Sequence, residues 1–370
     1  MISSTGILSV DLTAIQFNWL YVFARLRDGA QCAAVVKANA YGVGAVEVSK
    51  ALYAVGCRYF YVVTLHEAVE LRNALPSDVV LYVLGGVPDE MENIFADLNL
   101  IPVLHSRLVV DKWVSYCAMR KQAFPCVLKL NTGMTRLGLD VSELDQLLSA
   151  ATERCYLNPI LVMSHLACAD EPVHPLNNEQ LECFNSAITH IKNHYPQIKT
   201  SLANSSGAFL GNAYHFDMVR IGAALYGINP CADSPNPLKS AINLKLPVLQ
   251  IRITKRSESV GYGATESVPP GARLAVVAGG YADGIHRSLG LSPKGQIDGF
   301  EVKAVGRVSM DSCVFDITHI AGEPSYIEVI NDELSLDYLI RINKALGYEV
   351  LTSLGQRYKR HYFFTDVKNE

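Results

Sequence analysis

The 370-residue sequence has no excess of basic residues, since 32 Lys and Arg stand against 36 Asp and Glu for a formal net charge of −4. A nucleic-acid-binding protein needs a basic patch or stripe, so we expect no nucleic-acid partner. The chain also lacks a run of about 18 apolar residues, which a membrane-spanning helix requires. It lacks the basic segment that opens a signal peptide as well. We therefore expect no membrane association and a cytoplasmic location.

Paired cysteines are missing too. The nine cysteines are odd in number and include no C-x-x-C spacing, which in a chain of this length favours reduced thiols over a disulfide framework. Charged residues make up only 18% of the chain and hydrophobic residues 49%. This composition can bury a large core, and the length suggests one or two domains.

Residues 32–222 alternate short apolar runs with longer amphipathic segments. Eight runs have the length and composition of buried strands: CAAVV (32–36), YFYVV (59–63), VVLYVL (79–84), LIPVL (100–104), CVLKL (126–130), ILVMSH (160–165), IKTSLA (198–203) and DMVRI (217–221). Eight strands alternating with helices predict an α/β fold of the (β/α)8 or TIM-like barrel type. An open doubly wound sheet gives the same alternation.

The pattern changes after about residue 235, where a Pro- and Ser-containing connector leads into β-rich sequence with Gly, Pro and Asp turns. Helical periodicity returns only at about 335–346. These features predict a barrel domain over residues 8–235 and a mainly-β domain over residues 236–370. The segment ILSVDL, within residues 1–12, precedes the barrel pattern and is a candidate to pair with the later sheet.

Residues able to do chemistry follow the predicted barrel strands. Lys37 follows the first strand, Arg136 the fifth, and His165 ends the sixth, while Arg220 and Gly222 end the eighth. Barrel active sites lie at these C-terminal strand ends. A partly desolvated lysine there can form a Schiff base with pyridoxal phosphate (PLP), although a lone rim lysine is more often simply solvated. Small residues at 205–207 and 221–223 suit a phosphate cradle.

Several motifs make the sequence recognisable as similar to one family. AVVKANAYGVG (34–44) resembles the PLP-lysine signature of the alanine racemase family. Further motifs match in order along both predicted domains: KLNTGMTRLG (129–138), SHLACAD (164–170), LANSSGAF (202–209), MVRIGAALYG (218–227), SVGYGATES (259–267), AGGYADG (278–284) and VGRVSMD (305–311). The resemblance implies a PLP-dependent isomerase that interconverts L-alanine and D-alanine. It also implies a homodimer with composite active sites and a role in D-alanine supply for cell-wall peptidoglycan.

The resemblance also assigns roles to single residues. Lys37 is expected to hold PLP and to act as one base, and Tyr262 to act as the second base from the other subunit. Arg220 matches the arginine at the pyridine nitrogen, and Arg136 the one that orients a phenolate and the substrate carboxylate. Racemisation needs two bases because the α-proton leaves one face and a proton returns on the other, and a cation beside a phenol favours its phenolate.

The remaining assignments concern the rest of the pocket. Phosphate binding is expected from Tyr41, Ser205, Gly222 and Ala223, and contact with the cofactor from His165. The resemblance further implies substrate contact through the Met310 backbone, with Asp311 beside it, an entrance position for Tyr281, and carbamylation, as in some members, for Lys129.

This chain departs from the family pattern at several positions. Val43 and Ser201 stand where many members carry His, and Asn131 replaces a common Asp. A phosphate-binding tyrosine of some members aligns with Gln356, and Tyr358 lies two residues further on, so this last ligand stays unassigned.

Three other functions stay open from the sequence. A barrel-type PLP decarboxylase of basic amino acids shares the two-domain plan, but the GYGATES and GRVSMD segments argue against it. A non-catalytic PLP carrier of the single-domain barrel type lacks the β domain. Racemases of serine or other amino acids differ mainly in pocket size.

Overall fold

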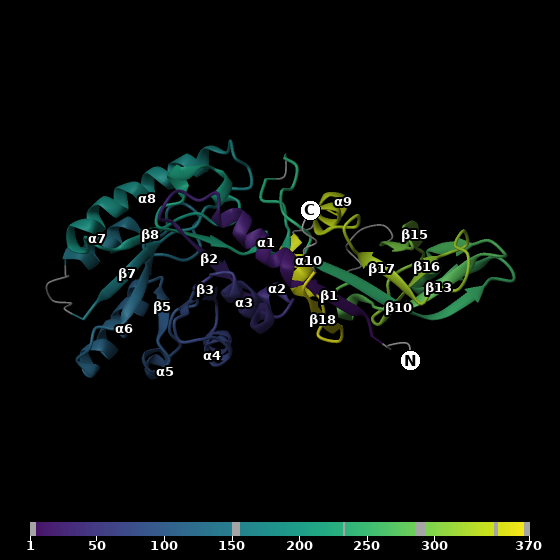
Figure 1. The fold of residues 1–370 in the computed structure, drawn as a ribbon, viewed down its shortest axis with the longest axis horizontal. Coiled ribbons are helices and arrows are strands. Elements are labelled where there is room, and N and C mark those ends of the chain that lie inside the picture. The colour runs from purple at the N-terminus through teal and green to yellow at the C-terminus, as the bar shows by residue number, and fades with distance from the viewer. Residues whose placement is uncertain (1–4, 150–155, 232–233, 286–292, 344–346, 366–370) are drawn as a thin grey trace.

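The computed structural model describes residues 5–149, 156–231, 234–285, 293–343 and 347–365. A parallel barrel, at the left of Figure 1, is joined to an antiparallel β domain at the right. Helices α1, α2 and α3 and strands β1 and β18 lie between them in this view. Within the described ranges, none of the helices combines the length and the apolar composition needed to span a bilayer.

The barrel sheet contains eight parallel strands in the order β8-β7-β6-β5-β4-β3-β2-β9. They are β2 (Gln31–Val35), β3 (Tyr59–Val62), β4 (Val80–Val83), β5 (Leu100–Leu104), β6 (Pro125–Lys129), β7 (Asn158–Met163), β8 (Lys199–Ser201) and β9 (Met218–Ile221). Two backbone hydrogen bonds join the ends of this order, from Asp217 N–H to Thr200 O at 3.0 Å and from Arg220 N–H to Ala203 O at 3.1 Å. Each predicted strand overlaps one observed strand, and the predicted fold class is confirmed.

Helices follow most of the barrel strands. They are α3 (Ala45–Ala54), α4 (Leu65–Ala74), α5 (Glu92–Asp97), α6 (Arg107–Arg120), α7 (Val141–Ser149), α8 (Pro175–His194) and the 3₁₀ helices η1 (Gly207–Phe209), η2 (Asn212–Tyr214) and η3 (Ala223–Tyr226). The barrel interior is filled by packed side chains. Tyr61 and Tyr82 stack with ring centroids 4.5 Å apart, and the Tyr61 hydroxyl donates to Met218 Sδ at 3.3 Å. The barrel is therefore a core rather than a channel, which confines the polar groups to its rims.

The β domain is built on an eight-stranded sheet in the order β13-β16-β15-β14-β17-β10-β1-β18. Its strands are β1 (Ile7–Asp11), β10 (Ile242–Ile253), β13 (Arg273–Ala278), β14 (Lys294–Ile297), β15 (Phe300–Ala304), β16 (Ser312–Asp316), β17 (Tyr326–Ile330) and β18 (Lys359–Phe363). A separate two-stranded ribbon pairs β11 (Glu258–Val260) with β12 (Glu266–Val268). The 3₁₀ turns η4 (Tyr262–Ala264) and η5 (Tyr281–Asp283) also belong to this half of the chain.

Strand β1 connects the two parts of the fold. It pairs antiparallel with β10 and parallel with β18, and Leu8 and Val10 on its inner face are fully buried. At Asp11 the chain turns into α1 (Leu12–Phe23), because the Asp11 carboxylate accepts hydrogen bonds from the Thr13 and Ala14 N–H groups as an N-cap. Residues 1–4 lie outside the described residues, and the domain boundary at 235/236 stays a prediction.

The C-terminal segment differs in part from expectation. The helix predicted at 335–346 corresponds to α9 (Leu336–Asn343), and residues 344–346 lie outside the described residues. A further helix, α10 (Gly347–Ser353), packs beside α2, and the edge strand β18 follows it. The sequence patterns predicted neither of these two elements.

Candidate active site

Nine of the predicted site residues lie at the C-terminal ends of barrel strands or in the loops that follow them. They are Lys37, Tyr41, Lys129, Arg136, His165, Ser205, Arg220, Gly222 and Ala223. Because all strands of the barrel are parallel, their C-terminal ends meet at one rim. The structure therefore brings these residues to one side of the barrel.

Lys37 begins an unusual backbone segment. The element α2 (Lys37–Tyr41) is a left-handed turn, with φ of 52° at Ala38, 55° at Asn39, 53° at Ala40 and 55° at Tyr41. For residues other than glycine this conformation costs roughly 1–2 kcal/mol each, so surrounding contacts must stabilise it. Strain of this kind is concentrated at functional sites.

Glu67 on α4 stabilises the beginning of this turn. Its carboxylate accepts a hydrogen bond from Ala38 N–H at 2.6 Å and two more from Val63 and Thr64 N–H at 2.9 and 3.0 Å. Thr64 Oγ1 accepts from Glu67 N–H, which completes a capping box at the start of α4. One carboxylate thus joins the helix cap to the segment that bears Lys37.

Arg220 lies buried inside the rim with only 4% of its surface exposed. Its guanidinium donates to Ser201 Oγ at 2.5 Å, to Ser164 O at 2.6 Å and to Leu202 O at 3.3 Å. Burial lowers the pKa of Arg220 to about 10, so the side chain stays protonated at neutral pH. Among the described residues no carboxylate pairs with it, and its positive charge is therefore available to a ligand.

His165 lies against this guanidinium. Arg220 Nη2 is 3.3 Å from His165 Nδ1, and because the guanidinium can only donate, Nδ1 is assigned as the acceptor. Burial, followed by the charge of Arg220, holds the pKa of His165 well below its ordinary value. The imidazole is therefore neutral at neutral pH.

Positive charge is concentrated at this rim. Burial and the charge of Arg136 lower the pKa of Lys37, and Glu67 acts in the opposite direction. Lys129, 7% exposed, has its pKa lowered to about 8 by burial and by its neighbours Arg136, Arg220 and Lys37. Such a set of cations, of which Lys129 and Arg220 are buried, Lys37 is half-buried and Arg136 is exposed, favours the binding of an anion.

A second group of contacts suits a phosphate. Ser205 Oγ accepts from Gly222 N–H at 3.0 Å and from Ala224 N–H at 3.2 Å, which leaves its hydroxyl proton free to donate. The Tyr41 hydroxyl lies so close to Gly222 that a β-carbon there would meet it at 2.4 Å, and within the described chain it makes no hydrogen bond. Ala223 N–H likewise has no acceptor there, so three donors converge near Gly222, as a phosphate requires.

The other four predicted residues lie on the β domain. Tyr262, 70% exposed, occupies the turn between β11 and β12, and Tyr281 and Met310 are 40% and 53% exposed. Tyr281 N–H donates to Ser309 O at 3.0 Å, which places η5 beside the segment that carries Met310 and Asp311. No hydrogen bond or ion pair between described residues joins these four to Lys37 within one chain.

The structure shows the burial and the contacts of the residues that depart from the family pattern. The Val43 side chain is fully buried in the core, and its carbonyl accepts from the Tyr362 hydroxyl at 2.8 Å. Asn131 forms the loop after β6 by accepting from Gly133 and Thr135 N–H. Tyr358 is 4% exposed, and its ring packs against Gly6 in the β domain, whereas Gln356 is exposed.

Both halves of the chain match models of one protein family. Residues 10–230 match the model described as "Alanine racemase, N-terminal domain", and residues 241–362 match "Alanine racemase, C-terminal domain". The chain belongs to the alanine racemase family. Among its relatives, the alanine racemase of Rhodospirillum rubrum is 45% identical over 363 residues, which cover 97% of this chain and 96% of the relative. The predicted family and enzyme class are confirmed.

Solved structures of this family have the same fold. The alanine racemase of Bartonella henselae with covalently bound pyridoxal phosphate is 36% identical, with a TM-score of 0.91 over 98% of this chain and 100% of that one. The biosynthetic alanine racemase of Pseudomonas aeruginosa is 32% identical, with a TM-score of 0.85 over the same shares. A catabolic relative from Agrobacterium fabrum is 38% identical over 97% of this chain and 92% of the relative, so overall similarity does not separate the two physiological roles.

Two residues that shape the site were not among the sequence predictions. The fully buried Gln180 donates to His165 O at 2.9 Å and accepts from Ala167 N–H at 2.8 Å, and the sequence carries no signal for this role. Glu67 could have been found, since Thr64 to Glu67 reads T-x-x-E, which is the pattern of a capping box.

Replacing Glu67 with Ala should remove the support of the left-handed turn. The backbone N–H of Ala38 then loses its acceptor, and we expect the free energy of unfolding to fall by about 1.5–3 kcal/mol, as for hydrogen bonds to charged groups. Chemical unfolding followed by circular dichroism, at one protein concentration, measures this. Glu70→Ala, on the exposed face of α4, is the control, and equal unfolding of both variants would contradict the role given to Glu67.

Proposed function

We propose that this chain interconverts L-alanine and D-alanine with PLP as its cofactor and supplies D-alanine for peptidoglycan. The observation that carries this proposal is the anion-binding rim, where partly desolvated cations lie beside three free hydrogen-bond donors. PLP carries both a phosphate and a phenolic oxygen, so the residues present fit its charge. Family membership supports the same conclusion, as does the cofactor of the Bartonella henselae relative.

The rim residues divide between the two ends of such a cofactor. Lys37 would bind it covalently through its amine, and Tyr41, Ser205 and Ala223 would donate to the phosphate beside Gly222, whose own N–H already donates to Ser205 Oγ. When bound, PLP supplies a conjugated ring that stabilises the negative charge left when alanine loses its α-proton. Because its lowered pKa increases the share of free amine, Lys37 is suited both to this bond and to proton transfer.

Arg220 and His165 would control the ring. A guanidinium donates a hydrogen bond but does not give up its proton at neutral pH. Although burial lowers the pKa of Arg220 to about 10, this value still lies well above neutral pH, so Arg220 keeps its charge. Arg220 would therefore hold an acceptor atom of the cofactor by a hydrogen bond without transferring its proton to it. By this means Arg220 would disfavour the protonation of the cofactor that transamination requires, and would favour return of the proton to alanine.

The two bases would come from different subunits of a homodimer. Lys37 serves one face of the α-carbon, and Tyr262 of the partner subunit serves the other, with Arg136 stabilising its phenolate. Substrate contact by Met310 and the entrance position of Tyr281 are proposed for the same partner surface. The exposure of Tyr262 on the β domain supports this arrangement, because an aromatic base left in solvent needs a second protein surface to form a site.

We further propose that the neutral Lys129 amine nitrogen bonds to the carbon of CO₂ and loses one proton to solvent, which gives a carbamate anion. Its pKa of about 8 gives a larger share of neutral, nucleophilic amine than an ordinary lysine has. The product is an anion, which the surrounding cations Arg136, Arg220 and Lys37 would stabilise. Carbamylation would thereby replace one of four like charges with an opposite one.

Purified protein should show a visible Schiff-base absorbance band and should convert L-alanine to D-alanine, as chiral chromatography detects. Borohydride should abolish the band, and Lys37→Ala should lack both the band and the activity because no amine is left to bind PLP. Lys359→Ala, an exposed lysine on β18, is the control. A folded wild-type protein that binds PLP but forms no D-alanine would contradict the proposed reaction.

Hybrid dimers test the composite site. Lys37→Ala and Tyr262→Ala should each be inactive, but co-expression should restore about one quarter of wild-type activity, since random pairing gives half hybrids and each hybrid has one intact site of two. Racemisation assays on the co-expressed mixture and on each single variant measure this. Continued inactivity of verified hybrids would place both bases in one subunit.

Carbamylation predicts a ¹³C NMR carbamate signal when the protein is supplied with ¹³C-labelled CO₂. At fixed dissolved CO₂ the signal should grow as the pH rises through about 8, because deprotonation of Lys129 exposes its amine. Lys129→Arg should lose the signal, and Lys359→Arg should keep it. An identical signal in Lys129→Arg would assign the carbamate to another amine.

A further inference from the structure

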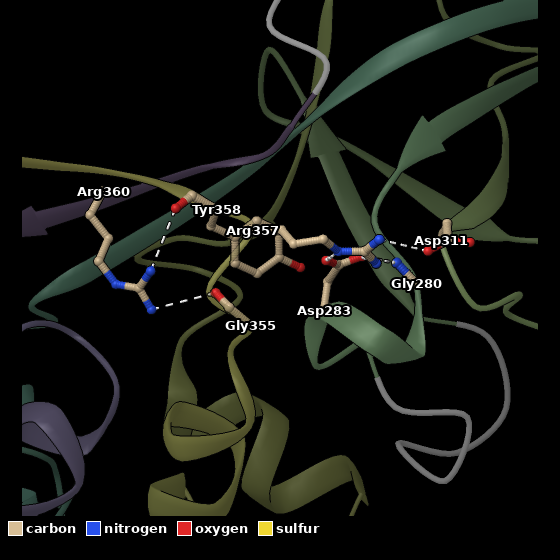
Figure 2. Close-up of polar contacts among 7 residues, drawn as sticks. All are labelled: Gly280, Asp283, Asp311, Gly355, Arg357, Tyr358 and Arg360. Carbon is tan, nitrogen blue, oxygen red and sulfur yellow. Dashed lines mark hydrogen bonds and ion pairs between the residues drawn. The ribbon is translucent and has the colours of Figure 1, made fainter.

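Arg357, just before β18, bridges two carboxylates on the β domain. Figure 2 shows its guanidinium between Asp283 and Asp311. Arg357 Nε and Nη2 donate to the two oxygens of Asp283 at 2.7 and 2.8 Å, and Nη1 donates to Asp311 Oδ1 at 2.7 Å. Asp283 is only 4% exposed and also accepts from Gly280 N–H at 3.1 Å. We call Arg357, Asp283 and Asp311 the arginine bridge.

The arginine bridge connects three chain segments, and backbone hydrogen bonds also join these segments. Ala282 N–H of η5 donates to Met310 O at 3.0 Å, and Gly355 N–H donates to Asp283 O at 3.2 Å. The approach is so close at Gly280 that a β-carbon would lie 2.3 Å from Met310 O. The positions of Tyr281 and Met310 are therefore fixed together.

These contacts leave one backbone group of Met310 available. Its carbonyl already accepts from Ala282 N–H, whereas its own N–H has no acceptor among the described residues, and the residue is 53% exposed. A free backbone N–H is a donor of the kind that binds a carboxylate. Asp311, the next residue, has its side chain oriented by Arg357.

We propose that Arg357 is a positioning residue for the substrate carboxylate, which rests on the proposed function. By bridging Asp283 and Asp311 it holds the Met310 N–H and the Tyr281 side chain in the arrangement that receives alanine. Arginine suits this role because its planar fork donates to two carboxylates at once, whereas a lysine ammonium acts as a single point charge. No other cation among the described residues pairs with either carboxylate.

The test compares Arg357→Gln and Arg357→Lys with a control, Lys359→Gln. The control removes a positive charge from an exposed residue two positions after Arg357. Steady-state kinetics of the PLP-loaded full chain with L-alanine and D-alanine give kcat and KM, and a thermal melt reports folding. We expect KM to rise about tenfold in Arg357→Gln with kcat changed less than about threefold, because substrate positioning is lost before chemistry. Arg357→Lys should recover only part of the KM.

Asp311→Asn provides a second route that avoids the buried carboxylate, since its side chain is 63% exposed. It should also raise KM. In the double variant with Arg357→Gln, KM should rise by less than the product of the two single increases, because the two residues act as one unit. Unchanged KM in these variants, or a loss of kcat and melting temperature alone, would overturn the proposal. Absence of racemisation in the wild-type protein would instead overturn the proposed function.

Discussion

The concentration of positive charge on a partly buried barrel rim is the constraint on which the rest of this structure depends. After burial, the charges of Arg136, Arg220 and Lys37 lower the pKa of Lys129. Arg136 also lowers the pKa of Lys37, and the Glu67 carboxylate acts against this at Lys37. Like charges brought together and desolvated raise the free energy of the folded chain. An anion bound among them reverses the sign of that contribution, so ligand binding and stability are coupled here.

The scaffold that holds these cations reaches across the whole chain. The left-handed turn after Lys37 is supported by Glu67 from α4 on one side. On the other side Arg360 of β18 donates to Gly42 O at 2.8 Å. Strand β18 also pairs with β1, and Arg357, just before it, forms the arginine bridge with Asp283 and Asp311. One C-terminal segment thus contacts both the lysine-bearing turn and the β-domain surface proposed to serve the partner subunit.

How much of this could be read from the sequence depended on burial. The barrel strands were predictable because parallel strands are covered on both faces and give continuous apolar runs, as β5 does with all five residues buried. Strand β18 was not, because none of its residues from Lys359 to Phe363 is fully buried and the edge strand has no apolar pattern. The left-handed conformation of Ala38, Asn39 and Ala40 gave no signal either, since contacts distant in sequence impose it.

The site residues also divide into those that strand order predicted and those that only the family resemblance predicted. Strand order predicted that Lys37, His165 and Arg220 share a rim, because the ends of parallel strands meet by geometry. The link from Tyr262 to Lys37 came from family resemblance alone, since no hydrogen bond or ion pair between described residues joins them within one chain. It stays a prediction, as do the individual residue roles.

The departures from the family pattern increase the dependence on a bound anion. Ser201 accepts from Arg220 and donates to Met218 O at 2.6 Å, so a neutral hydroxyl without a titration of its own replaces the usual His. At position 131 an Asp would face the Asp140 carboxylate, whereas the Asn131 amide donates to it at 2.9 Å. Asn in place of Asp at position 131 therefore stabilises the loop, but it removes one negative charge near Lys129 and Arg136. The rim then has fewer negative charges of its own than the family pattern provides. The proposed cofactor phosphate, substrate carboxylate and Lys129 carbamate are the anions that would supply them.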